Sequence, residues 1–148
     1  MAFLDLRKRK HAHAAKRLRD ELIIWLTTVT RQGQPQSSPV WFWWDGDVFH
    51  VFSQPRRPKL RNISANPRVS LHLEGGRTGD DIVVFEGRAK IVRDGDPATS
   101  FPEYIEKYRR LIQSYGWTPE SFAAFEKAAA GIGSAPSPLV ASWRPHRA

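Results

Sequence analysis

The stretch SQPRRPKLRNISANPRVSLHL, Ser53 to Leu73, lies between two strand-like runs and is rich in positive charge. Pro58 suits the first turn of a short helix, and Pro67 is expected to end that helix. The alternating run from Arg68 then reads as a strand. A solvated turn would need one or two cations, so the higher density here indicates a site for an anion. The cations are Arg56, Arg57, Lys59, Arg61 and Arg68.

Outward from this stretch, the chain shows a succession of strand signals. Six runs are rich in β-branched and aromatic residues and are separated by turn residues such as those of RQGQ and DGD. Both faces of the second and third runs are apolar, which favours a closed or half-closed barrel with further cover. The six predicted strands lie within residues 22–31, 35–44, 48–53, 68–74, 81–92 and 138–147.

Helical patterns flank these strands. Residues 5–21 fit a basic helix, residues 97–115 a second, and residues 119–130 a third with Thr118 as its N-cap. We therefore predict a mainly β fold with covering helices in a single domain. The parts of this six-stranded split β-barrel are a basic N-terminal helix (1–21), a barrel core (22–95), a helical segment (96–130) and a C-terminal strand (131–148).

Composition narrows the possible environments and partners. The 148 residues include no cysteine, which excludes thiolate metal sites and cysteine nucleophiles. No apolar run approaches the ~20 residues that span a bilayer, and the basic N-terminus lacks a signal-peptide core, so we expect a cytoplasmic protein. The net charge of +8 attracts polyanions: nucleic acid, an anionic membrane or a phosphorylated small molecule. The N-terminal helix reads as a solvated amphipathic helix rather than an arm on nucleic acid or lipid, so nucleic acid is not an expected partner.

Few side chains are placed for acid–base chemistry. No G-x-S-x-G elbow, Walker loop or G-x-G-x-x-G motif occurs, and Glu74 and Glu86 are isolated on strands. His50 and His72 are expected to be packed strand residues, and His11 and His13 lie on different faces of a helix. We therefore predict no metal site and no catalytic side chain, which favours an enzyme whose cofactor carries the chemistry.

A flavin-like cofactor would account for the cationic stretch. Arginine forks fit phosphate bidentately, and a lysine adds a point charge. Arg57, Lys59, Arg61 and Asn62 could bind the phosphate, with backbone N–H groups from the helix that begins near Pro58. The strand from Ser38 to Phe42 could supply the apolar wall and hydrogen bonds for the ring.

At these residues the sequence resembles the split β-barrel proteins of the pyridoxamine 5′-phosphate oxidase-like superfamily, which bind flavins and deazaflavins. The resemblance covers residues 20–93 and rests on WLTTVTRQGQPQSSPVWFWWDGD, SQPRRPKLRNISANPRVSLHL and DIVVFEGRAKIV, in that order. The pattern R-x-K-x-R-N, followed by P-R-V, is its most specific part. Within the superfamily the chain looks most like the F-420-dependent oxidoreductases of the B type.

The resemblance implies roles for particular residues. Arg57 and Lys59 match the cations that hold the cofactor phosphate, Arg61 and Asn62 continue that motif, and the Ser53 hydroxyl can reach the phosphate. The family is homodimeric with the site at the interface, so Trp143 and Arg144 of a partner copy are expected to complete it. The full cofactor-binding set is Ser37, Ser38, Pro39, Val40, Trp41, Ser53, Arg56, Arg57, Lys59, Arg61 and Asn62.

This chain departs from some relatives at Pro39 and Trp41, which stand where those relatives carry polar residues near the ring. Together with Phe42, Trp43 and Trp44 they put the substrate in doubt more than the cofactor. At least two of these four aromatic residues are expected to serve core or dimer packing.

The resulting hypothesis is an oxidoreductase that transfers a hydride from reduced F-420 to a small electron-poor molecule. The surplus cations Arg56, Arg68 and Arg77 suit the extended anionic tail of F-420 better than the single phosphate of FMN. Two alternatives stay open: an FMN-dependent oxidase or reductase, and a non-catalytic carrier of F-420, flavin or a tetrapyrrole.

Overall fold

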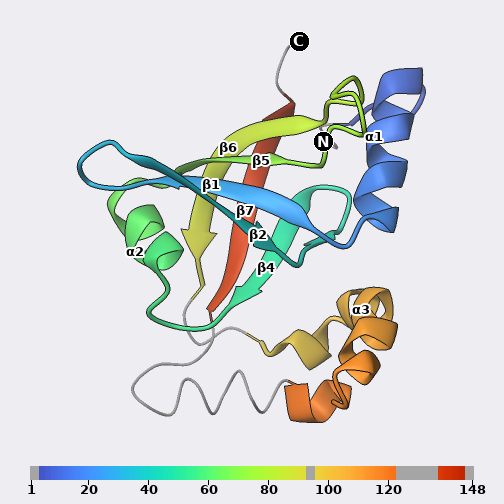
Figure 1. The fold of residues 1–148 in the computed structure, drawn as a ribbon, viewed down its shortest axis with the longest axis vertical. Coiled ribbons are helices and arrows are strands. Elements are labelled where there is room, and N and C mark those ends of the chain that lie inside the picture. Colours follow the sequence, from blue (N-terminus) through green and yellow to red (C-terminus); the bar gives the residue numbers. More distant parts are fainter. Residues whose placement is uncertain (1–3, 93–95, 123–136, 146–148) are drawn as a thin grey trace.

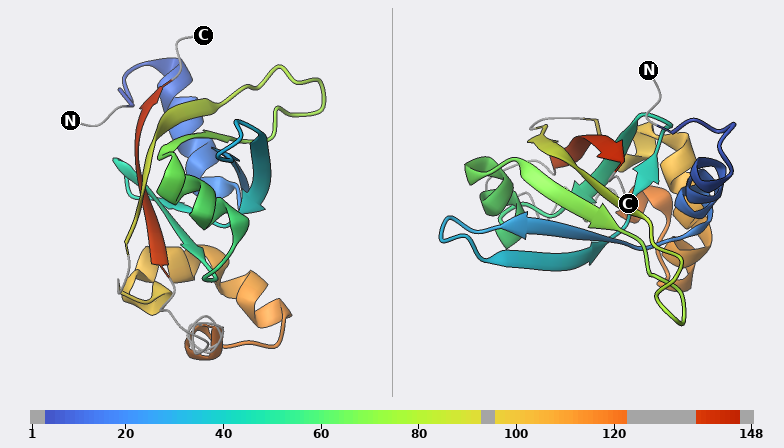
Figure 2. Two further views of the ribbon diagram at one scale, coloured as in Figure 1. Left: turned by 90° about the vertical axis from the view of Figure 1, so that its left-hand side faces the viewer. Right: turned by 90° about the horizontal axis from the view of Figure 1, so that it is seen from above.

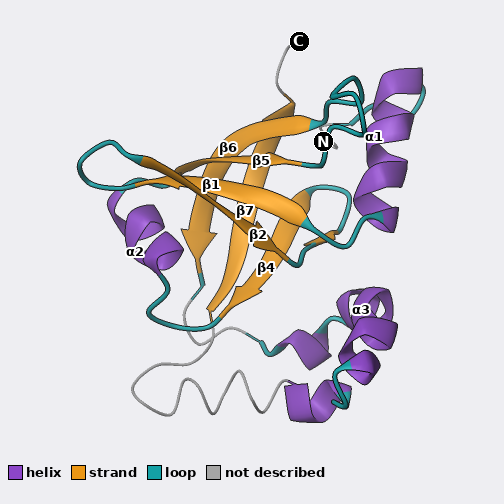
Figure 3. Ribbon diagram, in the orientation of Figure 1, coloured by secondary structure: helices purple, strands orange, loops and turns teal. Residues whose placement is uncertain are grey.

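The computed structural model describes residues 4–92, 96–122 and the backbone of 137–145. A β-sheet occupies the centre and helices lie around it (Figure 1, Figure 3). The elements in chain order are α1 (Arg9–Asp20), β1 (Ile24–Val29), β2 (Pro35–Val40), β3 (Trp43–Trp44), β4 (Val48–Ser53), α2 (Pro58–Ala65), β5 (Arg68–His72), β6 (Val84–Ile91), the 3-10 turn η1 (Ala98–Ser100), α3 (Pro102–Ser114) and β7 (Ser137–Pro145).

The order of strands in the sheet shows that it is rolled into a barrel. The strands are hydrogen-bonded in the order β2-β1-β5-β6-β7-β4-β3, and each pair is antiparallel. β2 and β3 therefore lie at the two ends of the sheet, yet only Trp41 and Phe42 separate them along the chain. Because two residues span only about 7 Å, the two edges of the sheet must approach each other there.

We call Trp41 and Phe42, which lead from one edge of the sheet to the other, the crossing between β2 and β3. The crossing also explains why there are seven strands and not the predicted six. The predicted second strand, residues 35–44, divides at Trp41 and Phe42 into β2 and β3. β2 pairs with β1, whereas β3 pairs with β4, so one apolar run serves both edges of the sheet. Periodicity could not reveal the division, because both halves are equally strand-like.

The barrel core forms from alternate residues of the strands. Leu26, Leu71, Phe85, Phe49 and Val51 are all at most 2% exposed. Helices extend the core: α1 contributes Ala15 and Leu18, and α2 contributes Leu60 and Ile63. The two helices lie on opposite sides of the sheet (Figure 1, Figure 2). The predicted mainly β fold with covering helices is confirmed.

A second apolar cluster surrounds α3. Its buried members are Ala98, Tyr104, Ile105, Tyr108 and Ile112. The aromatic run at residues 41–44 is divided between the two clusters. Phe42 is fully buried in the barrel and Trp44 packs beside it, whereas Trp41 and Trp43 pack against the α3 cluster. The expectation that at least two of these aromatics serve packing is confirmed.

Two side chains of α3 hold the crossing between β2 and β3. The Tyr108 hydroxyl accepts a hydrogen bond from the Phe42 N–H at 2.8 Å and lies 2.7 Å from the Leu22 carbonyl oxygen. Lys107 Nζ donates to the carbonyls of Leu18 and Phe42, at 3.1 Å each, and lies 3.5 Å from the centroid of the Phe42 ring. α3 thus connects the end of α1 to the crossing.

The helices differ from prediction mainly at their ends. The N-terminal helix begins at Arg9, not at residue 5, and the second predicted helix divides into η1 and α3 around Phe101. The third predicted helix begins at residue 119, and most of it lies outside the described residues. No helix in the described ranges is long and apolar enough to cross a membrane.

Candidate functional site

The cationic stretch forms the turn from β4 into α2. Ser53 ends β4 and is 5% exposed, with its hydroxyl donating to the Gln54 carbonyl at 3.1 Å. Arg56 has a φ of 65°, a left-handed conformation that is uncommon for a residue other than glycine. Arg57 is the N-cap of α2, and Pro58 occupies its first turn, as the sequence predicted. The Arg57 guanidinium donates to the side-chain oxygen of Gln54.

Asn62 fixes α2 to the first hairpin of the barrel. Its Nδ2 donates to Thr28 Oγ1 at 3.0 Å and to Gln36 Oε1 at 2.9 Å. Asn62 and Thr28 are 8% and 1% exposed, so this contact is almost closed to water. Asn62 therefore fastens α2 beside β1 and β2.

β2 forms the other wall of the candidate site. Side chains alternate along a strand, so Ser38 lies on the same face as Gln36, the face that meets Asn62. Ser37 and Pro39 lie on the opposite face, where Ser37 Oγ is 2.6 Å from Thr27 Oγ1. The predicted β2 residues are thus divided between two faces, and Ser38 is the hydroxyl on the side of α2.

Positive charge is concentrated at the start of α2. Lys59 is half-buried, and burial together with the neighbouring Arg57 lowers its pKa. Within the described part of the chain, no carboxylate forms an ion pair with Arg57, Lys59 or Arg61. Burying a cation beside another cation is unfavourable unless an anion compensates it. This arrangement fits a phosphate group.

The structure adds residues that sequence reasoning missed. Gln36 and Thr28 hold Asn62, and Gln54 holds Arg57. Thr28 and Gln36 occupy directly opposite positions on β1 and β2. The sequence could have shown that a Thr and a Gln face each other across the first hairpin. Nothing in it linked this pair to Asn62, which lies 26 residues after Gln36.

Three of the predicted site residues do not contribute a described side chain beside α2. Trp41 packs elsewhere, and only the backbone of Trp143 and Arg144 is described. The Trp41 ring stacks on Tyr108, with centroids 4.5 Å apart, and on Phe122. Trp143 and Arg144, on β7, lie opposite Gly87 and Glu86 of β6. The side chains of Trp143 and Arg144 are outside the described part of the structure. Contact of Trp41 with a cofactor ring stays a prediction.

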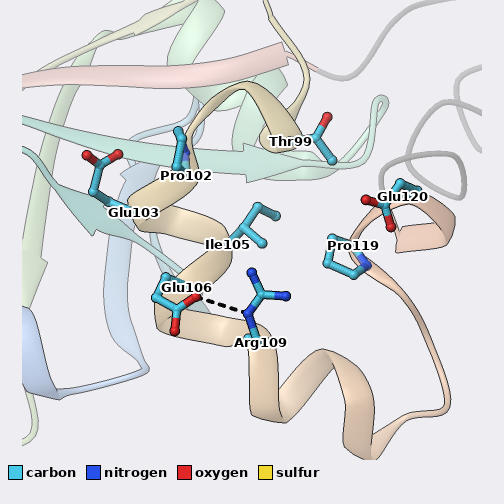
Figure 4. A pocket seen from close by; sticks show the side chains of 8 residues that line it. All are labelled: Thr99, Pro102, Glu103, Ile105, Glu106, Arg109, Pro119 and Glu120. Carbon is cyan, nitrogen blue, oxygen red and sulfur yellow. Dashed lines mark hydrogen bonds and ion pairs between the residues drawn. The ribbon is translucent and has the colours of Figure 1, made fainter.

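A hollow of about 500 Å³ lies elsewhere, beside α3 (Figure 4). It is open and presents three carboxylates, and one of them, Glu106, binds Arg109 at 3.0 Å. Its acidic lining suits an anionic cofactor less well than the cations of α2, so we place the candidate site at α2. The lining residues are Thr99, Pro102, Glu103, Ile105, Glu106, Arg109, Pro119 and Glu120.

The predicted strand histidines are packed. His50 Nε2 lies 2.8 Å from Asp45 Oδ2, and the ring stacks on Trp43. His72 stacks on Trp25, with centroids 6.3 Å apart. Burial works against ionisation of Asp45, yet its hydrogen bond from His50 and two backbone N–H groups keep its pKa below the usual range. These contacts account for both histidines as structural residues.

Comparison with proteins of known structure agrees with this fold. An F420 reductase is 26% identical, with a TM-score of 0.57 over 89% of this chain and 92% of its own. General stress protein 26 from Bacillus anthracis is 20% identical (TM-score 0.59; 95% and 90%). The haem storage protein HutZ from Vibrio cholerae is 18% identical (TM-score 0.52; 90% and 89%). The last two likenesses concern the fold alone.

Sequence comparison identifies the family. No curated protein matches the chain closely enough to count as a relative. The family model described as pyridoxamine 5′-phosphate oxidase, however, matches residues 11–134, which includes most of α1, the barrel strands β1 to β6, and α3. The chain therefore belongs to the pyridoxamine 5′-phosphate oxidase family, within the split-barrel superfamily that its sequence resembles.

Proposed function

We propose that this protein is an oxidoreductase that binds coenzyme F-420 on the surface formed by α2 and the adjoining end strand β2. The observation that carries the proposal is the set of cations on α2. Lys59 is half-buried beside Arg57, burial lowers its pKa, and no described carboxylate forms an ion pair with it. A phosphate placed there would stabilise both cations in their charged forms.

Two observations favour F-420 over FMN. The F420 reductase is 26% identical over most of both chains, which exceeds the identity of the haem storage and stress proteins. Arg68 also lies directly opposite Arg88 on β5 and β6, both exposed. Like charges opposite each other destabilise a sheet, and an extended polyanionic tail would relieve this repulsion better than a single phosphate.

The chain's own residues would bind and orient the cofactor. Arg57 and Lys59 would hold the phosphate, and Asn62 would keep α2 in register with β2. Ser38 would face the bound molecule from β2. F-420 supplies the hydride chemistry when bound, so the protein would contribute positioning, exclusion of water and a positive field.

We also propose that the protein is a homodimer and that the partner copy completes the site. β2 is at one end of the sheet and most of its residues are exposed, so a partner copy could cover this strand. Light scattering at concentrations around those of the binding assays would measure the assembly. A monomer that binds the cofactor tightly would contradict the shared site.

The experiment that tests the function is a side-by-side titration with F-420 and FMN, followed by cofactor fluorescence. We expect tighter binding of F-420, and a loss of about tenfold or more in the R57A/K59A variant. The control is K90A/R110A, which removes the same charge from exposed positions on β6 and α3. Preference for FMN would make the protein a flavin enzyme. Unchanged F-420 affinity in R57A/K59A would show that the phosphate lies elsewhere.

A carrier without turnover is the second candidate. It is favoured by the chemistry of the contacts around α2, which join amides, a hydroxyl and a cation: Asn62 with Thr28 and Gln36, and Arg57 with Gln54. Hydride transfer from reduced F-420 to a panel of quinones, enones and nitroaromatics would separate the two. Saturable binding with no transfer to any acceptor would support the carrier.

A further inference from the structure

The outer surface of α1 carries a second concentration of positive charge, distant in sequence from the site at α2. The helix lies along the outside of the barrel (Figure 1, Figure 2). It faces the core with Ala15 and Leu18, each 1% exposed. Its exposed residues are polar or charged throughout. They are Arg9, Lys10, His13, Lys16, Arg19 and Asp20.

The placement of these cations runs against helix electrostatics. The first turn of α1 has no acidic residue and begins with Arg9 and Lys10, and Lys8 at the N-cap forms no capping hydrogen bond. Cations are unfavourable at a helix N-terminus because the macrodipole is positive there. α3 follows the usual rule, with Glu103 in its first turn. Arg19, in the last turn, is favourably placed, but the helix gains nothing from the cations of its first turn, which points to a role for them outside the fold.

The nearby carboxylates leave this charge uncompensated. Asp5 binds Arg7, Asp20 binds Lys16, and Asp81 lies 2.9 Å from His13 Nε2 and 3.2 Å from Arg17 Nη1. Each acidic group is thus already paired. In the described part of the chain, Lys8, Arg9, Lys10 and Arg19 form no ion pair.

The arrangement of these cations around the helix indicates the shape of the partner. At roughly 100° per residue, the unpaired Arg9, Lys10 and Arg19 spread over roughly half of the circumference, on both flanks of the outward face. A flat membrane would meet the centre of the outward face better than its two flanks, and Leu6 and Leu22, the nearest exposed apolar residues, lie outside α1. A groove walled by phosphates on two sides would meet both. The major groove of a duplex, about 12 Å wide, admits an α-helix.

We propose that α1 is a sequence-independent binding surface for duplex nucleic acid, with phosphates of both strands contacting its two flanks. The sequence analysis did not expect this partner, because charge alone could not distinguish a solvated helix from a binding one. The circumferential spread of unpaired cations on a helix fixed to the barrel is the observation that separates them. This surface is independent of the cofactor site.

The test is fluorescence anisotropy with a labelled random-sequence duplex of about 20 base pairs. We expect affinity to fall about a hundredfold between about 50 and 200 mM salt, as for about four neutralised phosphates. The R9Q/K10Q/R19Q variant should bind at least about tenfold more weakly and show a much shallower salt dependence. F-420 binding and circular dichroism of the variant establish that it is folded.

The matched control is R88Q/K90Q/R110Q, which removes equal charge from exposed residues of β6 and α3. Wild-type affinity in this control, together with the loss in the α1 variant, would support the proposal. Equal loss in both would show only a response to net charge and would overturn it. Undetectable duplex binding at low salt would also overturn it. If the protein does not bind the duplex but binds phosphatidylserine vesicles through Arg9, Lys10 and Arg19, the partner of α1 is a membrane and the proposal is wrong.

Discussion

Two partly buried lysines, Lys107 on α3 and Lys59 on α2, have opposite electrostatic environments. Burial lowers the pKa of both. Lys107 donates to two backbone carbonyls, lies over the Phe42 ring, and has Glu21 and Asp20 nearby to favour its charge. Lys59 has Arg57 as its charged neighbour, which lowers its pKa further.

The comparison separates a structural from a functional cation. A buried polar group is normally satisfied within the fold, and Lys107 meets that expectation. Lys59 forms no ion pair among the described residues and has a cation as its charged neighbour, which is why we propose an anionic ligand for it. Residues with perturbed pKa values that the fold does not satisfy are candidates for function.

The largest effect should come from the α3 region. The Tyr108 hydroxyl is the acceptor for the Phe42 N–H at the crossing of β2 and β3. Tyr108→Phe leaves that buried N–H without a partner, so we expect a loss of about 2–3 kcal/mol in the free energy of unfolding. Urea denaturation measures it, with Tyr115→Phe as control because Tyr115 is 66% exposed. Equal stability of both variants would mean that the crossing is held by other contacts.

The fold was largely predictable because its signals are local. Alternation predicted the strands, and Pro58 and Pro67 predicted where the connecting helix begins and ends. The crossing at Trp41 and Phe42 was not predictable, because which edge a strand joins depends on partners distant in sequence. Tyr108, which binds Phe42 across 66 residues, carries no local sign of that role.

Substitution of Lys59, unlike that of Tyr108, should weaken cofactor binding without lowering the free energy of unfolding. Lys59→Met removes a half-buried cation beside Arg57, so we expect unfolding stability to be unchanged or slightly higher. F-420 affinity should fall about ten- to a hundredfold, the value of one hydrogen bond to a charged group. Titration and urea denaturation are run on the same samples, with Lys90→Met as control. Lost stability with retained affinity would assign Lys59 a structural role.

The pH dependence of stability tests the environment of Lys107. Burial lowers its pKa from 10.5 to about 7. Between these values the unfolded chain holds a proton that the folded chain lacks, so stability should rise with pH, by at most about 1.4 kcal/mol per unit. Below about pH 7 both states are protonated and the cost of burial is present in full.

Urea unfolding from about pH 7 to about pH 9 measures this slope, and Lys107→Met isolates it because the variant lacks the titrating group. We expect the wild-type protein to gain stability relative to the variant over this range. Parallel curves would mean that the carbonyls of Leu18 and Phe42 and the Phe42 ring keep Lys107 charged despite burial.

The candidate site was predictable only in its charge. Arg57 and Lys59 stand out because cations are dense in a short connection, and density is visible in sequence. Which face of β2 meets α2 was not visible, because it depends on the contact between Asn62 and Gln36. The predicted set therefore included Ser37, whose hydroxyl contacts Thr27, and omitted Gln36.

The smallest effect should come from Gln36, and it tests which face of β2 belongs to the site. Asn62 occupies Gln36 Oε1, which leaves the exposed Nε2 as a donor beside Ser38. Gln36→Leu should lower F-420 affinity a few-fold and cost under about 1 kcal/mol, because Asn62 keeps Thr28. Ser37→Ala, on the opposite face, should leave the affinity unchanged. If Ser37→Ala weakens binding and Gln36→Leu does not, the cofactor lies on the outer face of β2, and the cations of α2 reach it around the strand edge.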